Sequence, residues 1–148
     1  MKTLALNKKA RFDYEILEKF EGGLVLSGPE VKSIKAGHVQ LKGAFLHVHK
    51  GELWLKNAFI AKYGPAAGIQ KEYDPYQERK VLVHGRELEK FVGKTKQERL
   101  TLVPISLILR RNLIKLEFAL ARGKKKHEKR EAIKKRDVER QMQERMKE

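Results

Sequence analysis

The sequence contains no cysteine, so neither a disulfide bond nor a cysteine-ligated zinc site is available to stabilise the fold. It also has no apolar run approaching the length of about 18 residues that a membrane-spanning helix needs. The segment from Met1 to Arg11 lacks the hydrophobic stretch and the small-residue cleavage site of an export signal. Together these absences predict a cytoplasmic protein without a membrane partner.

Acidic residues are scarce relative to basic ones. The 148 residues include 34 Lys and Arg against 19 Asp and Glu, which gives a formal net charge of +15. So positive a field attracts polyanions, which makes nucleic acid the first partner to consider and an anionic membrane surface the second. The alternative explanation is solubility, or the Lys and Glu enrichment of thermally robust proteins. We favour polyanion binding because the excess of positive charge is large for this length.

The two parts of the chain differ in hydrophobic content but are both basic. Residues 122–148 contain 12 basic and 6 acidic side chains, and the rest of the chain contains 22 and 13. From Gly123 onward there are too few apolar side chains to offset the entropy of ordering. We therefore predict a globular domain over 1–122 and a basic tail over 123–148 that is disordered alone. Val138, Met142 and Met146 recur at four-residue spacing, which predicts a tail helix on binding.

Short apolar segments separated by turn residues indicate mainly β structure in the globular part. The alternation over 12–16 predicts a half-buried strand, the glycines within 21–23 a break, and 24–26 the returning strand of a hairpin. The clearest hairpin spans 44–60 around a Lys50-Gly51 turn. Its register places Val48 opposite Leu53 and Leu46 opposite Leu55 on an apolar face, with His49–Glu52, His47–Trp54 and Phe45–Lys56 paired on the other face.

The remaining segments predict short helices and further strands. Gly28-Pro29-Glu30 is typical of a helix start, and Gly37 ends that helix. Further along the chain we expect a long surface loop over 63–79, a strand over 81–83, a helix over 86–92 closed by Gly93, a strand over 100–109 with an edge, bulge or bend at Pro104, and a strand over 113–120 after an Arg111-Asn112 turn. Six or so short strands with one or two short helices predict a small, closed or nearly closed antiparallel barrel of the oligonucleotide-binding type.

No arrangement of residues points clearly to catalysis. Gly93-Lys94-Thr95 resembles the end of a phosphate-binding loop, but Leu88 stands where that motif needs its first glycine. His47 and His49 have a spacing that suits a metal, but no third ligand is singled out, so an exposed hairpin face is the better interpretation. A serine elbow and a cysteine nucleophile are both missing from the sequence. We expect no enzymatic activity, no metal and no cofactor.

Five segments spread along the chain together resemble the SsrA-binding protein (SmpB) family. They are Asn7-Lys8-Lys9-Ala10-Arg11-Phe12-Asp13-Tyr14, Gly28-Pro29-Glu30-Val31-Lys32-Ser33-Ile34-Lys35-Ala36-Gly37, Arg79-Lys80-Val81-Leu82-Val83-His84, Leu100-Thr101-Leu102-Val103-Pro104 and 119–130, in the family's order. The resemblance implies an oligonucleotide-binding barrel that acts as an adaptor of trans-translation. It also implies binding to the tRNA-like part of transfer-messenger RNA and delivery to stalled ribosomes, where the tail probes the decoding centre and the empty mRNA channel. The elongation factor and alanyl-tRNA synthetase would be indirect partners through the RNA.

The resemblance also implies which residues form the binding surfaces. The RNA-binding candidates are Asn7, Lys8, Lys9, Arg11, Glu30, Lys32 and Lys35, and the ribosome-binding tail candidates are Lys124, Lys125, His127, Glu128, Lys129 and Arg130. Glu30 has two interpretations, a helix-start carboxylate or an acceptor for base amino groups and 2′-hydroxyls. Glu128 replaces the family's usual Asp. Two other function classes stay open, a structural ribosomal protein with a basic extension and, less favoured, an RNA-processing enzyme.

Overall fold

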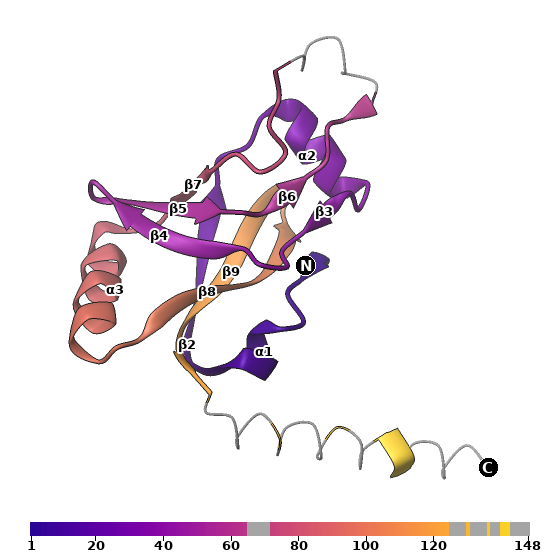
Figure 1. Ribbon diagram of the computed structural model, residues 1–148. Helices are drawn as coiled ribbons and strands as arrows, with labels where there is room; N and C mark the ends of the chain where they lie inside the picture. The colour runs from indigo at the N-terminus through magenta and orange to yellow at the C-terminus, as the bar shows by residue number, and fades with distance from the viewer. Residues whose placement is uncertain (65–71, 125–129, 131–135, 137–139, 143–148) are drawn as a thin grey trace.

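The structure is a computed structural model that describes residues 1–64, 72–124, 130, 136 and 140–142 (Figure 1). Its elements are β1 (Lys2–Leu6), α1 (Ala10–Asp13), β2 (Tyr14–Leu24), α2 (Gly28–Lys35), β3 (Val39–Gln40), β4 (Phe45–His49), β5 (Glu52–Lys56), β6 (Phe59–Ile60), β7 (Arg79–Leu82), α3 (Gly85–Gln97), β8 (Thr101–Arg110) and β9 (Leu113–Gly123). The predicted mainly β class with short helices is confirmed. None of the described helices is long and apolar enough to span a membrane.

Seven strands form one antiparallel sheet in the order β1-β8-β9-β2-β7-β5-β4, and β3 pairs with β6 in a small second sheet. The sheet curls so that β4 comes close to β8 (Figure 1). Among the described residues β1 and β4 end the sheet and do not pair with each other, so the sheet is not closed, and of the two predicted forms, a closed or a nearly closed barrel, the structure excludes the closed one. We call the region where the two ends of the curled sheet approach each other the seam. It is lined by residues of the β1–α1 connection and of the turn between β3 and β4.

The beginning of the chain differs from the sequence prediction. Residues 2–6 form an edge strand that pairs with β8, which the sequence analysis missed. The predicted strand from Phe12 is wrong over its first two residues, because Ala10–Asp13 is a short helix and β2 begins at Tyr14. Ala10 is buried against Val103 and Ala121, so tertiary packing holds the helical turn in place. The alternating pattern from Tyr14 onward is confirmed.

The predicted break at 21–23 is also wrong, because β2 continues straight through both glycines to Leu24. A Cβ atom added at Gly22 would lie 2.7 Å from Cγ1 of Val81 and 3.1 Å from the carbonyl oxygen of Leu82. Glycine is therefore required here by the close approach of β7, not by a turn. Since β7 follows far along the chain, this requirement has no local signal.

The β4–β5 hairpin has the predicted register throughout, with Val48 opposite Leu53 and His47 opposite Trp54. Lys50 and Gly51 both have positive φ, 50° and 74°, which is the geometry of the tight turns that match strand twist. The hairpin is shorter than predicted, because β5 ends at Lys56 and Phe59–Ile60 pairs with β3.

The predicted start and end of α2 are confirmed, whereas the predicted end of α3 is wrong. Ser27 and Glu30 form a reciprocal capping box at the start of α2, and Gly37 follows its end with φ +86°. By contrast, α3 does not close at Gly93 but continues to Gln97. The Thr95 hydroxyl donates to the Phe91 carbonyl oxygen at 2.8 Å, so Gly93-Lys94-Thr95 is helix interior and not a phosphate-binding loop.

The last two strands form a long hairpin with a bulge. The pairing of β8 with β9 shifts register between Pro104 and Ser106, which confirms the bulge as one of the predicted alternatives. Arg111 and Asn112 make the predicted turn, both with positive φ, and β9 runs past the predicted end at Leu120. Part of the predicted loop over 63–79, residues 65–71, lies outside the described residues.

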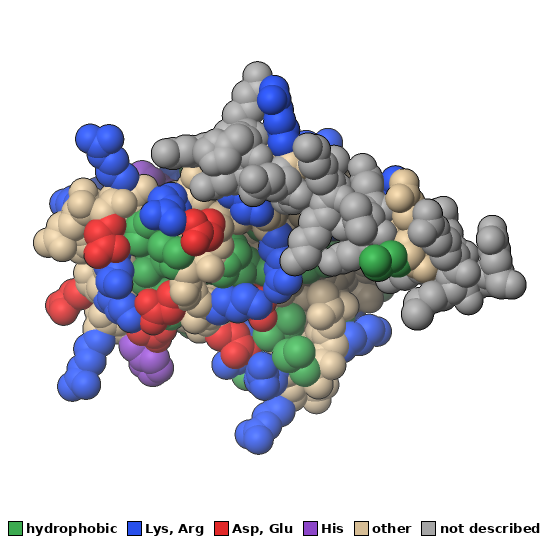
Figure 2. All heavy atoms as spheres, turned by 90° about the horizontal axis from the view of Figure 1, so that it is seen from below, with side chains coloured by type: hydrophobic (Ala, Val, Ile, Leu, Met, Phe, Trp, Pro, Cys, Tyr) green, Lys and Arg blue, Asp and Glu red, His purple; other side chains and the backbone are tan. Residues whose placement is uncertain are grey.

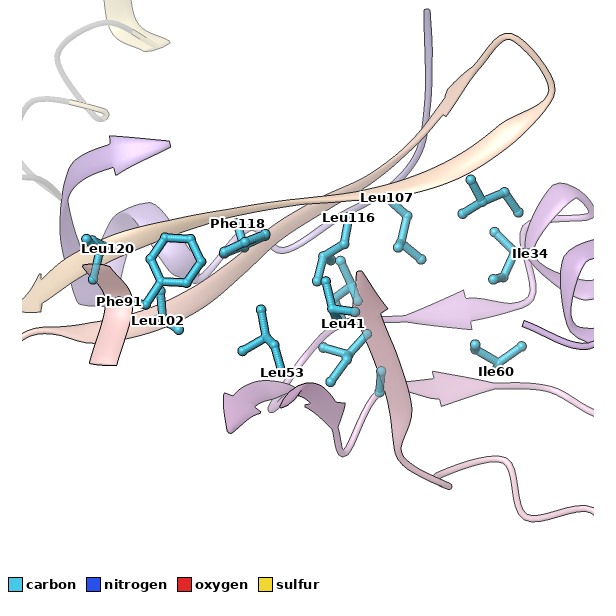
Figure 3. Close-up of a cluster of buried hydrophobic side chains, with 14 of the residues drawn as sticks. Ile34, Leu41, Leu53, Ile60, Phe91, Leu102, Leu107, Leu116, Phe118 and Leu120 are labelled. Atoms are coloured by element: carbon cyan, nitrogen blue, oxygen red, sulfur yellow. The ribbon is translucent and has the colours of Figure 1, made fainter. Parts of the chain in front are cut away.

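The hydrophobic core lies between the β8–β9 hairpin and the β5–β7 part of the sheet (Figure 3). Phe118 of β9 and Phe91 of α3 are fully buried and meet edge to face, with ring centroids 5.5 Å apart. Ile34 brings α2 into the same cluster at the other end. The core therefore holds α2 and the two strand edges of the seam in fixed positions.

Candidate nucleic-acid interface

The segment Asn7–Arg11 connects β1 to α1 and is held against the bulged strand. The Asn7 backbone N–H donates to the Ile105 carbonyl oxygen at 2.7 Å, and its side-chain amide donates to the Pro104 carbonyl oxygen at 3.0 Å. Asn7 is thus a positioning residue in this structure, whereas Lys8, Lys9 and Arg11 are exposed. A fixed backbone that carries exposed cations suits contact with phosphates.

Helix α2 presents the second set of predicted cations. Lys32 and Lys35 are both exposed, and the Lys32 ammonium lies 5.7 Å from the centre of the Tyr63 ring. The helix contacts β1, and β1 in turn contacts β3. In Figure 1, α2 lies at the top and α1 at the bottom of the molecule, with β3 and the N-terminus between them. The predicted basic residues therefore form two separate groups, one beside α1 and one on α2.

Glu30 differs from the other predicted RNA-binding residues because protein groups surround it. It is only 3% exposed, and its Oε2 atom accepts from Nε of Arg79 at 2.8 Å and lies 2.7 Å from Nη2. Its Oε1 atom accepts from the Ser27 backbone N–H at 3.0 Å. Gln77 and the Tyr73 hydroxyl also lie within hydrogen-bond distance of Oε2. Of the two interpretations of Glu30, these contacts favour the helix-start carboxylate.

The same network ties α2 to strands that follow much later. Arg79 is 2% exposed and donates from Nη1 to the Ala58 carbonyl oxygen at 2.7 Å and from Nη2 to the Tyr73 hydroxyl at 2.8 Å. The Tyr73 hydroxyl donates to the Ile60 carbonyl oxygen at 2.8 Å. A buried ion pair with all its hydrogen bonds made fixes the orientation of the groups that carry it. The exposed face of α2 is therefore set by buried residues.

Two pKa values are shifted in this network. Burial acts to raise the pKa of Glu30, but the hydrogen bond from Ser27 and the hydrogen bond and charge of Arg79 outweigh it, and the pKa is lowered from 4.5. Burial, followed by the negative charge of Glu30, raises the pKa of Tyr73 to about 12. The network is consequently composed of an ionised Glu30, a charged Arg79 and a neutral Tyr73 at neutral pH.

Two grooves run along the seam between the basic groups. The first, of about 340 Å³, lies between α1, the β3–β4 turn and the start of β8. The second, of about 600 Å³, lies between the β1–α1 connection and Val39–Lys42. Asn7, Lys9 and Lys42 line both grooves. The two grooves therefore share three lining residues, two of which are lysines.

Three residues, Arg79, Tyr73 and Lys42, were not predicted as site residues from the sequence. Arg79 carried a usable signal, because period-2 alternation places it on the same strand face as the apolar Val81 and Val83. A cation on the buried face of a strand implies a buried partner. Tyr73 and Lys42 carried no such signal, since both lie in irregular segments whose positions depend on tertiary contacts.

Few of the predicted tail residues belong to the described part of the chain. The Lys124 backbone N–H donates to the Asp13 carbonyl oxygen at 2.9 Å, and its ammonium donates to the Arg11 carbonyl oxygen at 2.8 Å. Arg130 is exposed. The other tail candidates lie outside the described residues, namely Lys125, His127, Glu128 and Lys129, as do Val138 and Met146. The start of the tail thus lies directly beside α1.

Basic side chains are frequent at the end of the molecule that carries α1. Seen from that end in Figure 2, Lys and Arg side chains project at several places from the described residues, and acidic side chains lie among them toward the left. Some acidic side chains of the protein pair with cations, as Glu21 does with Arg110 at 2.9 Å. The surplus of basic over acidic side chains, a formal net charge of +15 for the whole chain, favours phosphate binding.

The alternative metal hypothesis gains no support from the hairpin. The His47 and His49 rings stack with centroids 6.0 Å apart on the outer face of β4. Within the residues that the structure describes, no group of three or more possible ligands is positioned to hold a metal ion. The outer face of the hairpin is best described as an exposed surface.

These features define a class: a basic protein with a curled antiparallel sheet of the oligonucleotide-binding type and a groove suited to RNA. The sequence matches the SmpB protein family over residues 4–148. It is also 46% identical over 142 residues to the SsrA-binding protein of Persephonella marina, covering 96% of this chain and 92% of the relative. The chain therefore belongs to the SmpB family.

Further comparisons agree with this assignment. The SsrA-binding protein of Acaryochloris marina is 49% identical over 142 residues, covering 96% of this chain and 92% of the relative. Among solved structures, a chain from one described as "tmRNA-SmpB: a journey to the center of the bacterial ribosome" is similar with a TM-score of 0.65 and 45% identity, covering 82% of this chain and 84% of that one. The sequence likenesses cover 96% of this chain and the structural likeness 82%.

Proposed function

We propose that this chain is an RNA-binding adaptor of trans-translation, which binds the tRNA-like part of transfer-messenger RNA and delivers it to stalled ribosomes. The observation that carries the proposal is the family match over 4–148, combined with a lysine-lined groove on a basic surface. The relatives are named for SsrA binding, and the similar solved structure is named for transfer-messenger RNA, SmpB and the bacterial ribosome. The partners of this chain are accordingly that RNA and the ribosome.

The body of the protein binds the RNA through two groups of cations. Lys8, Lys9 and Arg11 contact phosphates from the α1 side, and Lys32 and Lys35 contact them from α2. Glu30 and Asn7 act differently, since their side chains are engaged with protein groups. They hold the two cationic segments in the orientation that the RNA backbone needs.

The domain and the tail bind different partners. Residues 1–122 form the RNA-binding domain, and 123–148 form a basic tail that is disordered alone and becomes helical in the decoding centre and empty mRNA channel. This tail binds the ribosome through Lys124, Lys125, His127, Glu128, Lys129 and Arg130. The Lys124 ammonium donates a hydrogen bond to the Arg11 carbonyl oxygen, so the start of the tail lies directly beside the RNA-binding segment.

The adaptor acts without catalysis and works in the cytoplasm, where ribosomes stall. The elongation factor and alanyl-tRNA synthetase reach it indirectly through the bound RNA. A structural ribosomal protein is the second candidate, because a basic body with a basic tail also suits rRNA.

The RNA that co-purifies with the chain from bacterial cells tests this proposal. A tagged full-length chain should retain transfer-messenger RNA in large excess over its share of cellular RNA. A Lys8→Ala, Lys9→Ala, Arg11→Ala triple variant should lose most of that enrichment, because phosphate contacts supply much of the affinity. Stoichiometric recovery of ribosomal subunits without transfer-messenger RNA would favour the structural ribosomal protein and reject the adaptor.

A further inference from the structure

The seam groove between α1 and β8 has the size and chemistry of a binding site for a single nucleotide. Its volume of about 340 Å³ lies near the lower end of small-molecule sites. Phe45 and Tyr14 supply aromatic rings, Lys9 and Lys42 supply cations, and Thr101 supplies a hydroxyl. This combination of a flat apolar surface with cations and hydrogen-bonding groups matches an unpaired nucleotide.

Both walls of the groove are built by specific contacts. On one side, Asn7 fixes the α1 connection to β8 through its bonds to Pro104 and Ile105. On the other side, the turn before β4 is closed by a bond from the Ala44 N–H to the Leu41 carbonyl oxygen at 2.9 Å. The groove is therefore a preformed feature of the open seam.

The turn that carries Lys42 depends on a glycine and an asparagine. Gly43 has φ +79°, a conformation that other residues rarely adopt. The Asn57 side chain donates to the Gly43 carbonyl oxygen at 3.1 Å and holds the turn against the β5–β6 connection. As a result the Lys42 side chain is presented at the junction of both grooves.

Phe45 is the most unusual residue of the lining. Its side chain is 48% exposed although it begins a strand, and it borders the groove rather than the core. An exposed aromatic ring beside lysines is available to stack on an unpaired base. The Asp13 carboxylate is the acidic member of the lining, and carboxylates accept hydrogen bonds from base amino groups and 2′-hydroxyls.

We propose that this groove binds one unpaired nucleotide of the bound RNA, with its base against Phe45 and its phosphate between Lys9 and Lys42. The inference rests on the proposed RNA-binding function and adds to it a defined subsite and a partner chemistry. Phe45 and Lys42 are then RNA-binding residues outside the set that the family resemblance supplied.

Two substitutions with different signatures test the proposal with the full-length chain and transfer-messenger RNA. Phe45→Ala should weaken binding by about five- to one-hundredfold, the effect of removing one base-stacking contact, and leave the salt dependence unchanged. Lys42→Ala should weaken binding and reduce the slope of log affinity against log salt by about one. Phe45→Tyr should bind like the wild type.

Matched controls come from exposed residues away from the groove. Tyr76→Ala removes another exposed aromatic side chain, and Lys96→Ala removes an exposed lysine on α3. Both should leave the affinity for transfer-messenger RNA unchanged. If Phe45→Ala binds as tightly as the wild type, or no more weakly than Tyr76→Ala, the nucleotide site is rejected while the proposed function stands. If the wild-type chain itself fails to bind the RNA, the proposed function is rejected and the site with it.

A photo-crosslinking amino acid at position 45 identifies what occupies the groove. In the complex with transfer-messenger RNA, it should crosslink to one nucleotide that is unpaired in the RNA secondary structure. Crosslinks distributed along a base-paired stem would overturn the proposal, because a paired base cannot enter a groove of this size. The same amino acid at position 76 provides the control.

Discussion

Nη2 of Arg79 lies 2.7 Å from Oε2 of Glu30, and both side chains are almost completely buried. This pair joins the first turn of α2 to the first residue of β7, although the two residues are far apart in the sequence. Since α2 carries exposed lysines of the proposed interface, the pair connects the stability of the fold with the geometry of RNA binding.

Breaking the pair should destabilise the protein strongly. Glu30→Gln removes the charge that compensates Arg79, and leaving one buried charge unpaired costs about 3–5 kcal/mol. Urea unfolding of the variant should show that loss in the free energy of unfolding. The matched control is Arg110→Ala, which breaks an exposed Arg–Glu pair with Glu21 and should cost no more than about 1 kcal/mol. Equal losses in the two variants would contradict the account.

The same pair predicts how stability depends on acid. The pKa of Glu30 is lower in the folded protein than its ordinary value of 4.5. The ionised Glu30 therefore contributes to the free energy of unfolding above pH 4.5, and this contribution is lost as the pH falls through the lower pKa of the folded protein. Stability measured from neutral pH downward should therefore decline in this window. Glu30→Gln lacks the titrating group, so its decline over the same window should be shallower. A parallel decline would show that other carboxylates control acid unfolding.

Gly22 offers a test of the contact between β2 and β7. A Cβ atom there would lie 2.7 Å from Val81 Cγ1, so Gly22→Ala forces strands or side chains apart at a cost of about 1–3 kcal/mol. Gly28→Ala is the control, because a Cβ atom at Gly28 has no neighbour within 4 Å and its cost should be within about 0.5 kcal/mol. Thermal or urea unfolding that ranks the two variants equally would be incompatible with this packing.

Truncation of the tail should separate RNA binding from activity on the ribosome. Removing everything after Gly123 leaves all of β9 in place, so the fold and most of the affinity for transfer-messenger RNA should be retained. Peptide tagging on stalled ribosomes should be abolished, because the segment proposed to enter the decoding centre is missing. The measurement pairs an RNA-binding assay with a tagging assay on the same truncated protein. Loss of RNA binding on truncation would refute the division between domain and tail.

Local features of the fold were predictable from the sequence, and features set by distant contacts were not. The β4–β5 register followed from strand alternation around Lys50-Gly51, and the α2 start followed from Pro29 and Glu30. By contrast, Gly22 resembled a turn glycine because the strand that requires it comes much later in the sequence. The open seam likewise depends on which strands end the sheet, which no single segment specifies.

The candidate site was predictable to a similar degree. The lysines of the N-terminal segment and α2 were predicted from the charge and the family segments in the sequence, and the structure shows that they are exposed. The surroundings of Glu30 were not, since its partners Arg79 and Tyr73 become neighbours only when β7 packs beside α2. Lys42 and Phe45 were not predicted as candidate residues for the same reason, because the groove that they line is formed only where two segments distant in the sequence meet.

The most direct test of the central claim is a competition measurement of RNA affinity with the full-length chain. Transfer-messenger RNA is compared with a structured RNA of equal length that lacks the tRNA-like part, at several salt concentrations. The account predicts much tighter binding of transfer-messenger RNA, with affinity falling steeply as salt rises because phosphate contacts release counterions. Equal affinity for both RNAs at every salt concentration would contradict it.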